Sequence, residues 1–312
     1  MNNKNNLEYI TQNSYKTLLW DYLRKNNLEN YSNIIKNGLH ENKSPFMDSN
    51  NANQLYKKLY NLSLVRKEAT IIKTQKHSNI MLASANNYSA FWNISNDKDI
   101  YEQDILLDEK KINYEFKNLS SFLKVQEDLV YDHFSNIEEI VLNHFSKTFS
   151  KAEEKAFVIG NGIDEMLGIT VDDEIESLDV DSNFSLDDLK ALFFSLDPIY
   201  RENAKWIMND KTALYLQTLK DNNGAYLWNI YDNKFMGKEV LISNHMPDII
   251  AGSKVIAFGD FSNYVLIERG LLTIKRFSEK FILSGHIGFI VTEFLDGKLV
   301  DKKSVKTLKI KG

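Results

Sequence analysis

The sequence predicts an α+β fold, in which helices and strands occupy separate stretches of a chain of 312 residues. Three observations support this prediction. Apolar residues keep a helical spacing over residues 135–160, an alternating pattern covers much of residues 70–130, and nearly everything after Lys254 has strand character. The composition, with 43% hydrophobic and 12% aromatic residues, is that of a globular protein.

The net charge of −5 is distributed unevenly along the chain. Residues 1–60 contain 8 Lys and Arg against 5 Asp and Glu, and residues 298–312 contain 6 against 1, whereas residues 61–297 contain 24 against 37. A protein that grips nucleic acid usually has a basic face and a high isoelectric point, and the isoelectric point here is about 5.8. We therefore expect an acidic body that tolerates nucleic acid without binding it tightly.

Composition also excludes several classes of protein. The chain has no cysteine, which rules out disulfides, thiol nucleophiles and cysteine-based metal sites. No apolar run approaches the roughly 20 residues of a membrane span, and the opening residues MNNKNNLEYITQ lack the apolar core of a signal peptide. We therefore expect a soluble protein that is made in the cytoplasm.

The first 69 residues predict an extended arm with short helices. A weak helical period covers residues 15–23, and after the break HENKSPFMDSNNAN a second period runs through Leu55, Leu59 and Leu62.

A long two-stranded excursion is predicted over residues 88–113. The strand patterns NYSAFWNIS and KINYEFKNLSSFLKV flank the polar stretch NDKDIYEQD, which has no glycine or proline for a tight turn. An isolated hairpin is only marginally stable in water, so we expect this one to lean on another chain. The residues expected to make that inter-subunit contact are Trp92, Lys98, Asp99 and Tyr101.

The clearest helix is predicted over residues 135–160. Ser135 and Glu138 match an S-x-x-E capping box, the apolar residues that follow keep helical spacing, and Gly160 is a natural stop. At 1.5 Å per residue this helix would be roughly 36 Å long, enough for a structural spine. Two shorter helices, at 185–196 and 210–219, are expected on either side of a buried strand at AKWIMN.

Two glycine-containing stretches predict changes of chain direction. In AFGDFSNYVLIERG (257–270), strand residues continue on both sides, so we expect a bend at Gly259–Asp260 and a turn at 269–270, and no phosphate or metal site. Farther on, TEFL and KLV flank the dipeptide at 296–297, which suits a type I′ turn and predicts a hairpin.

The acidic stretch 161–188 resembles a calcium loop only in part. It contains ten Asp and Glu and no Lys or Arg, and Asp179, Asp181 and Asp187 alternate as calcium ligands do. Phe184, however, replaces the required glycine, and Lys190 replaces the bidentate glutamate. We therefore expect a solvated acidic connection and no metal site.

No catalytic or cofactor motif is found elsewhere. The glycines of VIGNGIDEMLGI follow a helix and lack a G-K-[ST] ending, so they do not predict a phosphate site. The six histidines have no metal-ligand spacing, and His144 is expected to be a hydrogen-bonded packing residue. There is no G-x-S-x-G elbow, and adjacent carboxylates such as those at 153–154 point about 100° apart on a helix. We predict no catalytic residue and no cofactor.

Four segments together resemble a known family. They are EEKAFVIGNG, WIMNDKTALYLQTLKDNNGAYLWN, GKEVLISNHMP and VIAFGDFSNYVLIERGLLTIKR. In this order they resemble the major capsid proteins of tailed bacteriophages, those with the Hong Kong ninety-seven fold. Each motif is weak alone, and the specificity lies in finding all four in the family's order.

The resemblance implies a division of the chain into segments with separate roles. These are an N-terminal arm with short helices (1–69), strands and an extended loop (70–116), a peripheral domain with a spine helix (117–165), an axial domain (166–265), peripheral-domain strands (266–302) and a C-terminal strand (303–312).

The resemblance also implies a function. It is that of a phage or prophage head protein, which self-assembles as pentamers and hexamers into an icosahedral shell around double-stranded DNA, with a scaffolding protein, a portal and a maturation protease as partners. Some members crosslink their subunits through a loop lysine and an asparagine of the peripheral domain. Lys98 could be such a lysine, but FILSGHIGFIVTEF offers no asparagine, so we expect no crosslink.

Two other functions stay open at this stage. An encapsulin-like nanocompartment shell would share the fold and enclose enzymes, although the basic, Asn-rich arm favours a phage shell. A soluble hydrolase would need carboxylates brought together from distant segments.

Overall fold

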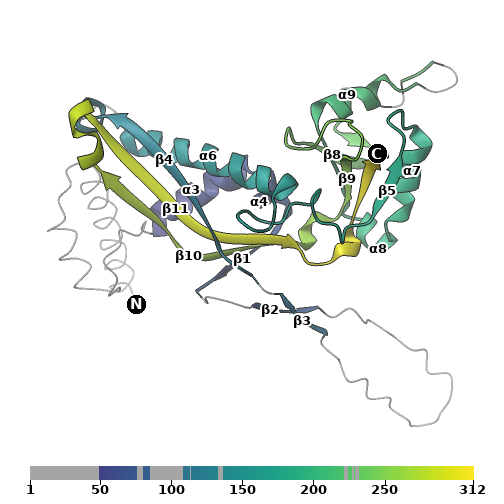
Figure 1. The fold of residues 1–312 in the computed structure, drawn as a ribbon, viewed down its shortest axis with the longest axis horizontal. Helices are drawn as coiled ribbons and strands as arrows, with labels where there is room; N and C mark the ends of the chain where they lie inside the picture. Colours follow the sequence, from purple (N-terminus) through teal and green to yellow (C-terminus); the bar gives the residue numbers. More distant parts are fainter. Residues whose placement is uncertain are drawn as a thin grey trace, which may run out of the picture.

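The computed structural model describes residues 49–75, 80–84, 108–112, 114–132, 136–220, 224–226, 228 and 232–312. The helical period at 15–23 and the strand NYSAFWNIS lie outside these residues. The described chain forms an elongated half and a compact half, and a two-stranded ribbon projects away from both (Figure 1).

The elongated half is a sheet with helices on one face. Its strand order is β1-β10-β11-β4, and the pairs are antiparallel except for β1 with β10. The bounds are β1 (Thr70–Thr74), β10 (Tyr264–Phe277), β11 (His286–Leu299) and β4 (Lys117–Gln126). Helices α3 (Ser49–Leu62) and α6 (Ile137–Ile159) cover the inner face, where their apolar side chains and those of the sheet form one core.

Helix α6 is the predicted spine, and it is unbroken over 23 residues, about 34 Å. Its N-cap is Asn136, whose side chain accepts a hydrogen bond from the Glu139 backbone N–H. The cap is therefore one residue beyond the predicted Ser135 box. At Gly160, which ends the helix as predicted, a Cβ atom would lie 2.0 Å from the Met166 carbonyl oxygen, so no larger residue fits there.

Helix α3 confirms the second helical period of the N-terminal segment. Leu55 and Leu59 are fully buried against α6 and the sheet. From residue 49 onward, this segment is therefore part of the hydrophobic core of the elongated half.

The compact half contains a six-stranded mixed sheet in the order β5-β12-β9-β6-β8-β7. The predicted strand at AKWIMN is β6, whose Trp206 is fully buried and stacks on Phe258 with ring centroids 4.1 Å apart. Both predicted helices are present as α7 and α9, and a capping box at Ser185 and Asp188 begins α7. The bounds are β5 (Ser177–Val180), β12 (Val305–Ile310), β9 (Lys254–Gly259), β6 (Lys205–Met208), β8 (Lys238–Ile242), β7 (Lys234–Phe235), α7 (Leu186–Ser195), α8 (Pro198–Arg201) and α9 (Asp210–Thr218).

Short elements complete the described chain. They are α4 (Leu64–Glu68), α5 (Glu127–Tyr131), the 3-10 turns η1 (Phe261–Asn263), η2 (Glu279–Ser284) and η3 (Lys302–Ser304), and the projecting pair β2 (Ile80–Ser84) and β3 (Asp108–Ile112). None of the helices in the described ranges is both long and apolar enough to cross a bilayer.

The basic C-terminal segment folds back on the acidic stretch. Strand β12 runs parallel to β5, and three lysines reach across from this segment. The ion pairs are Lys302–Asp172, Lys306–Glu176 and Lys311–Asp181. The basic end therefore neutralises part of the acidic body and is not a free tail.

The predicted hairpin at Asp296–Gly297 is wrong. Strand β11 runs straight through both residues and pairs them with Ile267 and Leu266 of β10. Asp296 is buried and accepts a hydrogen bond from the Glu115 backbone N–H, so its polar side chain is satisfied within the sheet. The glycine is needed for space, because a Cβ at 297 would lie 2.9 Å from the Tyr264 ring.

The two changes of direction predicted in 257–270 have different outcomes. The bend is confirmed: β9 ends at Gly259, and the Asp260 carboxylate caps η1 by accepting from the Ser262 N–H at 3.0 Å. The turn at Arg269–Gly270 is instead a bulge within β10, where Gly270 has φ +73° and the strand continues.

Replacing Gly297 with alanine should lower the free energy of unfolding by about 1–3 kcal/mol, because the new methyl group must displace Tyr264 or Met166. Urea unfolding measures this change, with Ser120→Ala on the exposed face of β4 as the control. An unfolding midpoint close to that of the wild type would contradict the close packing of Gly297 against Tyr264 and Met166.

Candidate functional site

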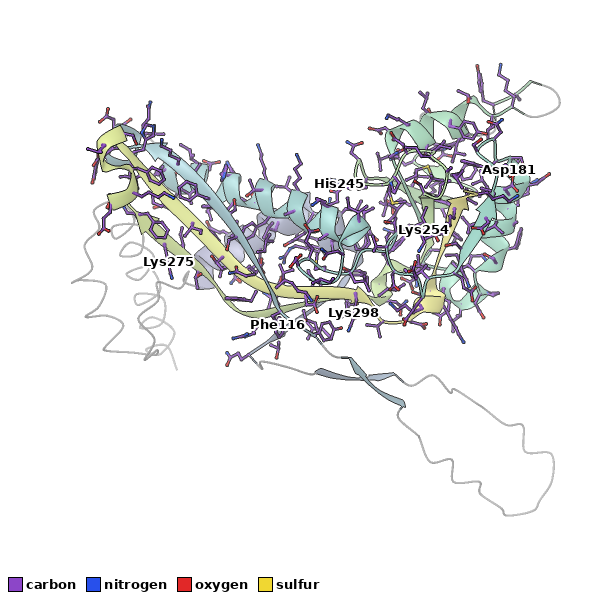
Figure 2. The ribbon with its side chains drawn as sticks, viewed as in Figure 1. Phe116, Asp181, His245, Lys254, Lys275 and Lys298 are labelled. Carbon is purple, nitrogen blue, oxygen red and sulfur yellow. The ribbon has the colours of Figure 1, made fainter. Side chains whose placement is uncertain are left out.

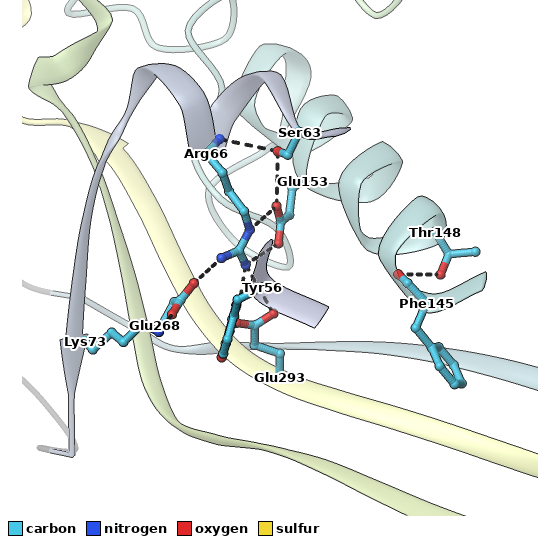
Figure 3. Close-up of polar contacts among 9 residues, drawn as sticks. All are labelled: Tyr56, Ser63, Arg66, Lys73, Phe145, Thr148, Glu153, Glu268 and Glu293. Carbon is cyan, nitrogen blue, oxygen red and sulfur yellow. Dashed lines mark hydrogen bonds and ion pairs between the residues drawn. The ribbon is translucent and has the colours of Figure 1, made fainter. Parts of the chain in front are cut away.

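A buried charge cluster joins the N-terminal helices to the spine and the sheet (Figure 3). Arg66 of α4 donates to both carboxylate oxygens of Glu153 on α6, at 2.8 and 2.6 Å. It also donates to Glu268 of β10 and lies 3.4 Å from both oxygens of Glu293 on β11. The Tyr56 hydroxyl of α3 donates to Glu293 at 3.1 Å, so five elements of the fold meet here.

Local structure explains why these side chains converge. Ser63 caps α4 and donates its hydroxyl to Glu153 at 3.3 Å, which sets the position of Arg66 one turn later. Glu268 and Glu293 lie on the face of the sheet that the helices cover, where both are buried. Because side chains alternate between the two faces of a strand, Glu268 and Glu293 both point into the core, where they contact the Arg66 guanidinium.

The cluster has more negative than positive charge. Three carboxylates surround one guanidinium, and Lys73 approaches Glu268 at 3.6 Å from the exposed side. Burial raises the pKa of Glu293 to about 8, with Arg66 opposing the shift and Glu153 adding to it. Burial opposes the charge of Arg66, but its carboxylate partners overcome that effect and hold its pKa well above the ordinary value.

The buried cluster has the features of a structural site. Burial raises the pKa of the Tyr56 hydroxyl, with the charge of Glu293 adding to it, so Tyr56 stays a hydrogen-bond donor. The side chains of Arg66 and its three glutamates are at most 2% exposed, so no substrate reaches them from solvent. The cluster stabilises one arrangement of helices on the sheet.

The other candidate positions do not converge into a reactive site. Among the residues that the structure describes, no group of three or more His, Asp or Glu side chains could hold a metal ion. Asp179 is in β5, while Asp187 is in the first turn of α7, so the calcium-like residues belong to different elements. The prediction for His144 is wrong in one respect: its Nε2 atom is buried without a hydrogen-bond partner in the described structure, and the ring packs edge-on against Phe145.

One cavity of about 390 Å³ lies between the end of α4 and the compact half. Lys205 bridges Glu68 at 2.9 Å and Glu239 at 2.8 Å on its wall. Two of the four carboxylates that line the cavity, Glu68 and Glu239, are therefore held in ion pairs with this lysine.

The outer face of the long sheet combines aromatic and basic side chains. Phe122, Phe277 and Phe294 are 44%, 42% and 36% exposed. Phe122 lies flat across the sheet because Gly288 beneath it has no side chain, and a Cβ there would be 2.8 Å from its ring. The basic residues at outward positions are Arg269, Lys124 and Lys275, the last labelled in Figure 2. No carboxylate occupies an outward position over 118–126, 269–277 or 286–294.

The projecting ribbon is the base of the predicted excursion. Strands β2 and β3 pair antiparallel, from Ile80 opposite Ile112 to Ser84 opposite Asp108, so the chain leaves and returns at one place. The ribbon projects away from the body of the subunit (Figure 1). The candidate contact residues Trp92, Lys98, Asp99 and Tyr101 lie outside the described residues.

Replacing Arg66 with methionine should lower the free energy of unfolding by about 3–5 kcal/mol, because three buried carboxylates lose their only guanidinium. Thermal unfolding of the purified subunit measures this loss. The control is Lys155→Met, which removes an exposed ion pair with Glu165 and should cost about 1 kcal/mol or less. Equal effects of the two substitutions would contradict a structural role for the cluster.

Comparison with known proteins identifies the family. The model of the phage capsid family matches residues 47–310, whereas no curated protein sequence matches significantly. The capsid of a native GTA particle superposes with a TM-score of 0.64 and 24% identity over 88% of this chain and 95% of that chain. The satellite phage P4 procapsid gives 0.57 and 11% over 83% and 99%, and a virus-like particle from Pyrococcus furiosus gives 0.51 and 13% over 84% and 99%. This chain belongs to the phage capsid family and is a major capsid protein with the Hong Kong ninety-seven fold.

Proposed function

We propose that this capsid protein tiles an icosahedral shell of pentamers and hexamers around double-stranded DNA in a tailed-phage virion. The observation that carries the proposal is the family match over residues 47–310, which spans nearly all of the described chain. The similarity to capsids of a GTA particle and of a P4 procapsid supports it. Symmetric repetition of modest interfaces would do the work, and no catalysis is required.

The two halves of the fold and the ribbon can each be assigned a position in the proposed shell. We assign the elongated half with α6 to the peripheral domain and the compact half to the axial domain at the centre of a capsomer. The β2–β3 ribbon would be the base of the extended loop. The peripheral domain receives contacts from neighbours, and the buried Arg66 cluster keeps its helices fixed on the sheet while they form.

The outer face of the sheet is the surface that we expect the neighbour's loop to cover. The loop tip NDKDIYEQD contains four carboxylates and one lysine, whereas the outer face over 118–126, 269–277 and 286–294 carries Arg269, Lys124 and Lys275 and no outward carboxylate. Opposite charges fix the register of such contacts, and the exposed aromatic rings supply apolar area. Because the ribbon projects away from the body of its own subunit, we expect a second copy to provide the loop.

The remaining partners follow from the same role. A scaffolding protein, a portal and a maturation protease would act on the shell during assembly, after synthesis in the cytoplasm of the bacterial host. The acidic body, with 24 Lys and Arg against 37 Asp and Glu over residues 61–297, would keep the wall from adhering to packaged DNA.

Expression of the full chain should yield closed particles visible by negative-stain electron microscopy. Treating the purified particles with nuclease, disrupting them and extracting their contents then identifies the cargo. Protected double-stranded DNA in particles from a phage-producing host supports the proposal. Particles that hold enzymes and no nucleic acid would assign the chain to a nanocompartment, and a monomer with hydrolase activity would contradict a shell role altogether.

Reversing two charges on the outer face, with Lys124→Glu and Lys275→Glu together, should abolish or reduce particle formation at least tenfold while the subunit stays folded. Adding Asp97→Lys and Asp99→Lys in the loop should restore assembly, because the pairing is re-formed with opposite signs. Particle yield is measured by sedimentation.

The matched control is Lys147→Glu with Lys151→Glu, which makes the same charge change on the exposed side of α6 and should leave assembly intact. Normal assembly of the Lys124/Lys275 variant would remove the outer face from the interface while leaving the shell function in place.

A further inference from the structure

We propose that Arg66 and its three glutamates form a proton-dependent latch at the base of the projecting hairpin. The geometry supplies the reason. Glu153, Glu268 and Glu293 all lie within 3.4 Å of the one guanidinium, and all are buried. Like charges that share a buried site cannot all ionise cheaply, so the assembled cluster favours holding one proton.

Distance assigns that proton to Glu293. Glu153 is bound by two guanidinium hydrogen bonds at 2.8 and 2.6 Å, and Glu268 is bound by a third. Glu293 is 3.4 Å from the guanidinium through both oxygens and otherwise receives the Tyr56 hydroxyl at 3.1 Å. It is the least compensated of the three carboxylates, and burial raises its pKa to about 8.

The groups that face Glu293 come from every element packed around it. They are Tyr56 from α3, Arg66 from α4, Glu153 from α6 and Glu268 from β10. Lys73 of β1 reaches the cluster only through Glu268, at 3.6 Å with its side chain 61% exposed, and its ammonium lies 4.1 Å from the centre of the Tyr56 ring. Solvent screens this lysine, so it compensates the buried negative charge poorly.

The Arg66 cluster fixes α4, which leads through β1 into the β2–β3 hairpin. Helix α4 ends at Glu68, and β1 begins two residues later and leads into β2. Strand β1 has five residues and pairs with β10 alone within the described sheet, so its own hold is weak. When Glu293 loses its proton, the unpaired negative charge weakens the Arg66 contacts that fix α4, and β1 loosens with it.

The pH dependence has a definite sign. The pKa of Glu293 in the folded protein exceeds its ordinary value of 4.5, so the stability that its proton supplies is complete below about pH 4.5 and is lost as the pH rises toward and through 8. Local opening of α4 and β1 should increase about tenfold from pH 6 to pH 7, less steeply as the pH passes through 8, and about 100-fold in all between pH 6 and pH 9.

Hydrogen–deuterium exchange on the full chain tests the proposal. Peptides covering residues 63–75 are followed at pH 6, 7, 8 and 9, with correction for the intrinsic exchange rate of each amide. Wild-type protection should fall by about 100-fold, whereas Glu293→Gln, which is neutral at every pH, should keep its protection within about twofold. Glu165→Gln removes a surface carboxylate paired with Lys155 and should respond to pH as the wild type does.

Three results would overturn the latch. Wild-type protection of residues 63–75 could stay constant from pH 6 to pH 9. Glu293→Gln could lose protection as the wild type does. Protection could also fall equally in the axial strands β6 and β9, which would show a global effect of pH. The wild-type series carries the test by itself if Glu293→Gln does not fold.

Discussion

The elongated half depends on the ladder between β10 and β11, two strands of 14 residues each. Strand β11 is paired on both sides along most of its length, with β10 and β4, and the spine helix α6 packs against β11 and β4. It also delivers two carboxylates, at 268 and 293, to the same buried point from neighbouring strands. The contacts of Arg66 depend on this register, and the position of the N-terminal helices on the sheet depends on those contacts.

Local signals in the sequence were sufficient for the elements that carry their own periodicity. The apolar stripe of α6, the helix that follows Ser185 and the buried strand around Trp206 each carry their signal within one helix or one strand, and each was predicted. The bend at Gly259 was predicted for the same reason. The hairpin predicted at 296–297 was wrong because the turn preference of this dipeptide is weaker than the cross-strand pairing that continues β11 through it. Such pairing joins residues far apart in the sequence, so no local pattern predicts it.

The buried charge cluster could not be predicted, because Arg66 is 87 residues from Glu153 and 227 from Glu293. A partial signal was nonetheless present: Glu268 and Glu293 each interrupt an apolar strand, YVLIERG and FIVTEFL, and the residue two positions before each of them is buried in the core. A carboxylate at such a position requires a buried partner. The sequence therefore indicates that a cation must exist, and the fold is needed to identify it.

The two faces of the long sheet differ in what covers them within the subunit. The inner face is covered by α3 and α6 and contributes to folding, because its apolar area is removed from water within one chain. The outer face exposes three phenylalanines beside cations, and exposed apolar patches of this kind are typical of surfaces that contact another chain. Gly288 leaves room for the Phe122 ring above it, because a Cβ atom at residue 288 would lie 2.8 Å from that ring. Under the proposed shell role, subunit stability and shell formation would depend on opposite faces of one sheet, so a substitution on the outer face would impair assembly while the fold survives.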